Sequence, residues 1–440
     1  GITGRLAGDV NGPKIEASCN YGNILNETEA TYNYLGGIVG YSTVVATIGS
    51  ESGPCINYGQ IRNTGPSSNS SINGQPNIAV AGIIGGILTK PCTVECCSNL
   101  NSVFNYSQLA FGGPDGINKT TVGGIVAFSA TESIIRDCCN SAPVYSCNDS
   151  TGTKMSRSYT GGILGYSYRK ALGSFSGNTN EAEVKSDGLH VFDDSVGGLI
   201  GLVDAVATDL SSCSNNADVI NLATRTESDV LSDGTKATAV CIGGIVGHHS
   251  GSGTLYDCIN TGTIINTASE YHSGSNMGGI AGQMSSNGKI KTCSNQGNVL
   301  HTAEPTTASL YYSLGGIVGL SSGAIAISDN CTNSGRIEKS AVTSVKNNHY
   351  IGGILGRNNA QGTSISDCSN IGDGSTGKGC TISSSPTNNV YMGGILGHTN
   401  KTISISRCTN SGAVKRAAIH CVSSASSDVS IVMYALAIPY

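Results

Sequence analysis

Histidine, cysteine and acidic side chains are the groups of this chain that could perform chemistry. None of the eight histidines lies in a His-Glu-x-x-His zinc motif. The chain also lacks a Gly-x-Ser-x-Gly segment followed by a plausible catalytic triad, and a phosphate loop ending in Gly-Lys-Ser/Thr. We therefore predict that the protein is not an enzyme and uses no cofactor and no metal ion.

The acidic residues are scattered along the chain. Asp137, Asp257 and Asp367 each precede a cysteine of a repeated motif, and Asp193-Asp194 is the only adjacent aspartate pair. Calcium binding by the three single aspartates is conceivable. A solvated outer face is the favoured interpretation, because calcium-binding loops rich in oxygen ligands are missing.

The cysteines number 17, and most of them recur at one position of a repeat. Nine share this position: Cys55, Cys97, Cys138, Cys213, Cys258, Cys293, Cys331, Cys368 and Cys408. Ser18 and Ser176 take their place elsewhere, which indicates a small packing residue rather than a metal ligand or nucleophile.

Disulfide candidates are found among the remaining cysteines. Cys380 and Cys421 follow their motif cysteines by 12 and 13 residues, so we expect them to stack in neighbouring repeats as the best disulfide candidates. Cys139 with Cys147 is a weaker candidate. We expect an oxidising, extracellular setting.

These residues are carried by a repeat that spans nearly the whole chain. A Gly-Gly-Ile-Val-Gly segment, such as 243–247, recurs about ten times, including a weaker copy at 81–85. Each is followed by Cys-x-Asn-x-Gly-x-Ile/Val, whose cysteine lies 15 or 16 residues after the first glycine. A fixed period of this size predicts a stacked repeat architecture.

The second motif alternates with period two, which predicts a strand. Cys258, Asn260, Gly262 and Ile264 share one face, and we expect the asparagines of successive repeats to bond as a ladder. The apolar pair after the glycines is either buried on both faces of the strand or turned inward together by a bend. We predict an all-β fold, a β-solenoid (parallel β-helix) of about 10–11 coils, right-handed, over residues 1–416. Its first residues match the second half of a motif, so we expect a start in mid-repeat, in a processed or cropped chain.

The segment 417–440 departs from the repeat. It is interpreted as a capping strand or as a donor strand that completes the first coil of a neighbouring molecule. The assembly residues are Ile431, Val432, Tyr434, Leu436, Ile438 and Tyr440.

The position directly after the Gly-Gly-Ile-Val-Gly segment could carry recognition. Stacking would align a candidate binding stripe of Tyr41, Phe128, Tyr166, His248, Arg357 and His398. A second stripe, two residues before the glycines, would hold Tyr34, Tyr159, Tyr350 and Tyr391. Such rows could bind an extended glycan or peptide; the alternative is a variable turn residue that covers the strand end.

Asn-x-Ser/Thr sequences provide glycosylation candidates. They include Asn26, Asn69, Asn105, Asn118, Asn148 and Asn400. The net charge of -5 and the absence of a basic cluster argue against nucleic acid, and no apolar run is long enough to span a membrane.

The paired motifs, Gly-Gly-Ile-Val-Gly and Cys-x-Asn-x-Gly-x-Ile, resemble the GLUG-type repeats of bacterial surface proteins through about residue 416. Such repeats also accompany the peptidase module of immunoglobulin-A metallopeptidases, whose zinc motif is missing here. The resemblance implies a secreted or surface-anchored bacterial protein; a protist surface is an alternative origin.

Three functions follow as hypotheses. The first is an extracellular structural or adhesive surface protein that assembles head to tail into fibres and binds host or matrix glycans or proteins. The second is a carbohydrate-active enzyme or glycan-binding module on a β-helix, which would need clustered carboxylates from adjacent coils. The third is a passive binding module of a larger enzyme.

Overall fold

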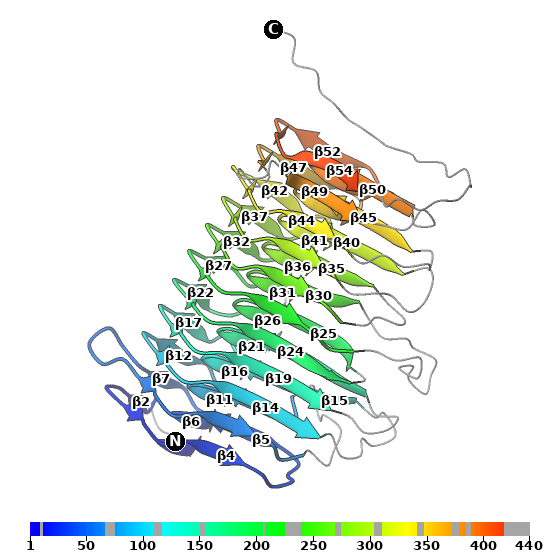
Figure 1. Cartoon of the computed structure of the whole chain (residues 1–440). Coiled ribbons are helices and arrows are strands. Elements are labelled where there is room, and N and C mark those ends of the chain that lie inside the picture. Colours follow the sequence, from blue (N-terminus) through cyan, green and yellow to red (C-terminus); the bar gives the residue numbers. More distant parts are fainter. Residues whose placement is uncertain are drawn as a thin grey trace.

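The computed structural model of the chain is a β-solenoid in which the strands stack along one axis (Figure 1). The structure describes residues 1–8, 12–66, 75–108, 117–149, 155–189, 191–205, 207–224, 239–268, 274–302, 310–340, 347–371, 378–383 and 389–417. All the regular elements in these ranges are strands, and every pairing between them is parallel. The predicted all-β solenoid is confirmed.

One coil contains five strands, as residues 240–266 illustrate. They are β30 (Val240–Gly243), β31 (Val246–His249), β32 (Thr254–Tyr256), β33 (Ile259–Asn260) and β34 (Ile264–Asn266). Each strand pairs with the fifth strand before it and the fifth after it, which produces five sheets.

The five sheets are numbered here in chain order. Sheet I contains ten strands, from β5 (Asn33–Gly36) to β50 (Asn389–Gly393). Sheets II to V contain eleven strands each: β1 (Thr3–Leu6) to β51 (Leu396–Thr399), β2 (Lys14–Ile15) to β52 (Ile403–Ser406), β3 (Cys19–Asn20) to β53 (Thr409–Asn410), and β4 (Ile24–Asn26) to β54 (Ala413–Ala417). Ten or eleven strands per sheet agree with the predicted 10–11 coils.

The glycine pair forms the corner between sheets I and II. Ile245 and Val246, which follow it, are both fully buried in the same core cluster. The bend is therefore the correct alternative of the two that the sequence left open. It turns two consecutive apolar side chains inward at every coil.

The predicted asparagine ladder is present along the whole stack. Eleven asparagines, one per coil, are joined by ten amide bonds of 2.7–2.8 Å from each Nδ2 to the next Oδ1. In Asn260, the second N–H of the amide donates to the carbonyl of Gly262 at 2.8 Å. The ladder thus satisfies buried backbone carbonyls as well as itself.

The ladder packs against the glycine corner of its own coil. A Cβ atom built on Gly244 would lie 2.3 Å from Cγ of Asn260, and equivalent atoms in the other coils would lie 2.1–2.4 Å from their asparagine. Carbon atoms cannot approach this closely, so the corner requires glycine. The two sequence motifs, fifteen residues apart, therefore pack directly on one another.

The motif cysteines form an inward column beside the core. Eight are buried in the core cluster and Cys408 packs against it. Cys97 donates to the carbonyls of Ile48 and Glu95, each at 3.3 Å. One assignment was wrong: the register pairs Cys139 with Thr179, so Asn178, and not Ser176, takes the place of Cys138. Asn178 is fully buried.

The residue before the cysteine column has a left-handed backbone in ten coils. These residues are Ala17, Cys96, Asp137, Gly177, Ser212, Asp257, Thr292, Asn330, Asp367 and Arg407. Aspartate, asparagine and glycine tolerate this conformation best, whereas a β-branched residue such as Thr292 (φ 54°) is strained there. The aspartates noted in the sequence thus occupy a corner that favours their backbone conformation.

Thr292→Asn is expected to raise the free energy of unfolding by roughly 0.5–1 kcal/mol, because it relieves this strain at an exposed side chain. The midpoint of urea unfolding checks the effect. Thr254→Asn, in the extended strand β32, is the matched control and should produce no gain. Equal midpoints for T292N and the parent chain would contradict the strain argument.

A further inward column lies at the end of the sheet II strands. Ser42, Ser129, Ser321 and Asn358 each donate to the carbonyl two residues onward. In the seventh coil this position is His249, fully buried, with Nδ1 2.9 Å from the carbonyl oxygen of Gly251. Burial outweighs its carbonyl contacts and lowers the pKa of His249.

His249→Asn is expected to reduce the loss of stability on acidification. Because the folded pKa lies below the unfolded value of 6.5, the unfolded chain takes up a proton first as the pH falls. The contribution of His249 to stability is therefore fully present above pH 6.5 and decreases as the pH falls below it. Melting temperatures from pH 7.5 to 5 should decrease less in H249N than in the parent chain. Ser321→Asn is the control; an unchanged slope in H249N would contradict the prediction.

Candidate functional site

The predicted binding stripe is one continuous row on the outer face of sheet II. Strand pairing aligns, in order, Arg5, Tyr41, Gly86, Phe128, Tyr166, Leu202, His248, Gln283, Leu320, Arg357 and His398. Parallel strands lie about 4.8 Å apart, so the row is about 48 Å long. We call it the first row.

A second row runs along the outer face of sheet I. It consists of Tyr34, Ala79, Thr121, Tyr159, Ser195, Cys241, Asn276, Ser313, Tyr350 and Tyr391. The glycine corner brings the two rows into contact: ring centroids are 4.8 Å apart in Tyr159–Tyr166 and 4.6 Å apart in Tyr350–His398. Together they form the corner stripe, a site that the sequence predicted as two separate rows.

In the fourth to sixth coils the stripe is a packed aromatic cluster. Phe128, Tyr159 and Tyr166 are at most 2% exposed and pack in a cluster separate from the core. The hydroxyls of Tyr159 and Tyr166 donate to Asp193 at 2.9 Å and to Asp204 at 3.2 Å. Burial, followed by the adjacent carboxylates, raises the pKa of both tyrosines, so they stay protonated donors. These three aromatic side chains are therefore buried, and they support the surface residues that cover them.

In the seventh and eighth coils the stripe is a polar network. Gln283 accepts a hydrogen bond from Asn276 at 2.9 Å and donates to Ser285 at 2.8 Å. A ring nitrogen of His248, Nε2, lies 2.8 Å from the same serine hydroxyl. Burial lowers the pKa of His248, so the imidazole is neutral at pH 7.

In the ninth to eleventh coils the stripe combines aromatic rings with a cation. The guanidinium carbon of Arg357, in β46 (Leu355–Asn358), lies 4.7 Å from the ring centroid of Tyr311 and 4.8 Å from that of Tyr350. The rings of Tyr350 and Tyr391 are stacked with centroids 5.3 Å apart. Burial, followed by Arg357, lowers the pKa of His398.

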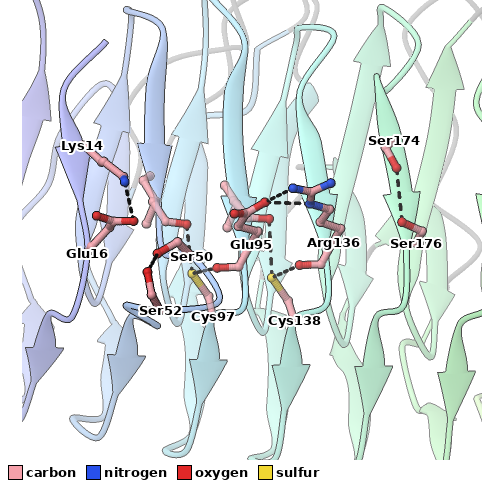
Figure 2. Close-up of polar contacts among 12 residues, drawn as sticks. Lys14, Glu16, Ser50, Ser52, Glu95, Cys97, Arg136, Cys138, Ser174 and Ser176 are labelled. Carbon is pink, nitrogen blue, oxygen red and sulfur yellow. Dashed lines mark hydrogen bonds and ion pairs between the residues drawn. The ribbon is translucent and has the colours of Figure 1, made fainter.

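A small cavity lies on another face, at the corner that precedes the cysteine column. Its lining includes Glu95, Cys96, Arg136 and Asp137. Nε of Arg136 donates to Glu95 at 2.6 Å, across neighbouring coils (Figure 2). The positive charge of Arg136 and the negative charge of Glu95 therefore compensate each other. Within the described ranges, no three histidine, cysteine or acidic side chains gather as a metal-binding group.

The other predicted residues are distributed over the solenoid. The Asn105 side chain is fully buried and accepts a hydrogen bond from Asn63 at 2.8 Å, and Asn26 donates to Asn63. A glycan on Asn26 or Asn105 would have to open these bonds. Asn400 lies after β51, the backbones of Asn118 and Asn148 lie in β15 (Ile117–Gly123) and β19 (Val144–Asp149), and Asn69 lies outside the described residues.

The structure does not form the candidate Cys139–Cys147 disulfide: the Cys139 thiol is free and lies 3.3 Å from the hydroxyl of Ser141. The backbone of Cys380 pairs in register with Val414. Cys421 and the six assembly residues of the C-terminal segment lie outside the described residues. In the described part of the chain, no helix has the length and apolar character needed to cross a membrane.

The structure contains a polar column inside the solenoid that the sequence analysis did not predict. Strand pairing aligns Asn221, Asn266, His301 and Lys339, and all four side chains are fully buried. The ammonium of Lys339 lies 5.4 Å from the ring centroid of Tyr312. Extending the two-residue alternation of the second motif by two residues beyond its Ile or Val would have identified the column.

Neither family models nor curated proteins nor solved structures contain a match to this chain. Its candidate site therefore rests on geometry: an outer stripe of aromatic, amide and basic side chains, held in register by the stacked corners.

Proposed function

We propose that the protein is an extracellular structural and adhesive surface protein, in which the solenoid is a rigid rod and the corner stripe binds an extended ligand. The observation that carries the proposal is the register of the two rows, which sets side chains at regular intervals along the whole stack. In this proposal the chain acts by binding and not by catalysis. The resemblance to GLUG-type surface repeats supports an extracellular location at a cell surface.

Rigidity supports the proposed role as a rod. From β5 onward, every coil bonds to the next through five parallel strands and through the asparagine ladder. Each coil contacts only its neighbours, so length can grow without a larger core. A stalk or adhesive surface needs this property more than it needs a deep pocket.

Adhesion by the full chain on beads, to cells and to extracellular matrix, tests the proposal. Replacing the partly exposed row residues Tyr41, His248 and His398 together by serine is expected to abolish adhesion. Arg136→Gln, on another face, is the control and should adhere like the parent chain. Unchanged adhesion of the triple variant would refute the stripe as the adhesive surface.

Head-to-tail assembly is the second part of the proposal and has its own test. Electron microscopy of the purified chain is expected to show fibres with an axial repeat close to one rod, about 48 Å plus its ends. Truncation after Ala417 should dissolve them, because it removes the proposed donor strand. Single rods for the full chain at high concentration would contradict assembly.

A further inference from the structure

We infer that the C-terminal half of the corner stripe, from His248 to His398, is a binding site for an acidic glycan, whose carboxylate or sulfate group is held by Arg357. The inference rests on the proposed adhesive function and names its ligand class. Figure 1 shows the strands that carry the centre of the site, β40 (Tyr311–Gly315), β41 (Val318–Ser321), β45 (Asn348–Gly352) and β50, next to one another near the C-terminal end of the stack.

Arg357 carries a charge that the described residues leave uncompensated. Its Nε atom has no hydrogen-bond partner, and no described carboxylate forms an ion pair with it. Elsewhere on the surface, Arg136 and Arg407 are each paired with an acidic residue of the preceding coil. A guanidinium held beside two rings and lacking a counter-ion is prepared to bind a carboxylate or a sulfate group.

The surroundings of Arg357 favour an anionic ligand. From the seventh coil onward, the two rows contain ten residues, and none of them is acidic: Cys241, Asn276, Ser313, Tyr350, Tyr391, His248, Gln283, Leu320, Arg357 and His398. The N-terminal half differs, because Asp193 and Asp204 border its tyrosines. Lys119 also lies over the rings of Tyr166 and Tyr168, so the charges of that half are mixed and compensate one another, and we place the site in the C-terminal half.

The remaining side chains match a sugar. Tyr311 is 48% exposed and offers an aromatic face for the apolar face of a sugar ring. The amides of Asn348 and Asn389, bonded to one another at 2.9 Å, follow Tyr311 in the same column and can bond hydroxyls. The five first-row residues from His248 to His398 span about 19 Å, which suits an extended oligosaccharide.

Nucleic acid is the less favoured polyanion. Both imidazoles of this half have lowered pKa values and are neutral at pH 7, so Arg357 is the single permanent cation of the ten residues. Binding to a phosphate backbone normally uses several basic side chains in series. One cation among amides, hydroxyls and tyrosines fits a polymer with sparse charge and many hydroxyls.

Binding of the immobilised full chain to four probes tests the inference: polygalacturonate, dextran sulfate, neutral dextran and a single-stranded thymidine oligomer. We expect binding to polygalacturonate, to dextran sulfate or to both, which separates carboxylate from sulfate, and none to dextran or the oligomer. Arg357→Gln should weaken binding about tenfold or more, as expected for a lost charge-assisted bond.

Three variants keep the test decisive. Arg357→Lys retains the charge without the planar fork and should bind with intermediate affinity. Tyr311→Ala should weaken binding several-fold, and Arg136→Gln should leave it unchanged. Equal losses in R357Q and R136Q, or preferred binding to the oligomer, would overturn the inference.

The inference and the proposed function fail in different ways. If neither acidic glycan binds but the triple serine variant still loses adhesion to cells or matrix, the ligand class is wrong and the adhesive stripe stands. If adhesion survives the triple serine variant, the proposed function fails as well.

Discussion

Gly244→Ala should destabilise the solenoid by more than about 3 kcal/mol, a large effect for one methyl group. The added Cβ would lie 2.1 Å from the carbonyl oxygen of Gly279 in the next coil and 2.3 Å from Cγ of Asn260. Neither neighbour can move freely, because one is backbone and the other is a rung of the ladder. The coil must open at this corner or separate from the next coil.

Chemical unfolding and limited proteolysis measure the effect. The unfolding midpoint of G244A should fall strongly, and proteolysis should start near the seventh and eighth coils, since each coil depends on its neighbours. Gly22→Ala is the matched control: its Cβ would meet only the amide oxygen of Asn20, at 3.9 Å. If G244A unfolded at the same midpoint as G22A, the close contact between corner and ladder would not be required.

Much of this fold could be predicted because the signals are local and repeated. The alternation of Cys258, Asn260 and Ile264 places them on one face at any coil, and the repeat places copies above one another. The asparagine ladder follows from these two facts. The direction of Ile245 and Val246 does not follow, because it depends on a backbone bend that glycine permits and sequence does not specify.

The candidate site could be predicted only in part. The repeat register predicted which residues form the two rows. The exposure of each row residue depends instead on contacts between the rows: Phe128 and Tyr166 are buried because aromatic neighbours and long strands meet there and cover them. The carboxylates that accept hydrogen bonds from these tyrosines, Asp193 and Asp204, come from different strands. Lys339 was missed for a related reason, because a lysine is expected outside unless the column that contains it is known.

Asn260→Asp should also cost more than about 3 kcal/mol at neutral pH, although the side chain keeps its shape. The Asn260 amide accepts from Asn215 and donates to Asn295 and to the Gly262 carbonyl. A carboxylate can still accept, but it would face two oxygen atoms where two N–H groups now donate. It would also be a charge on a fully buried side chain.

The pH dependence of this variant separates lost hydrogen bonds from lost packing. Burial and the facing oxygens would raise the pKa of the new carboxyl in the folded state above its unfolded value near 4. The stability of N260D relative to the parent chain should therefore recover as the pH falls towards that raised pKa, because a protonated carboxyl donates one bond. Asn298→Asp is the matched control, since Asn298 only accepts from the backbone of Arg336 and Asp218 fills the same role towards Thr263. If N260D and N298D unfolded alike at pH 7, the ladder would be a packing row whose hydrogen bonds contribute little to stability.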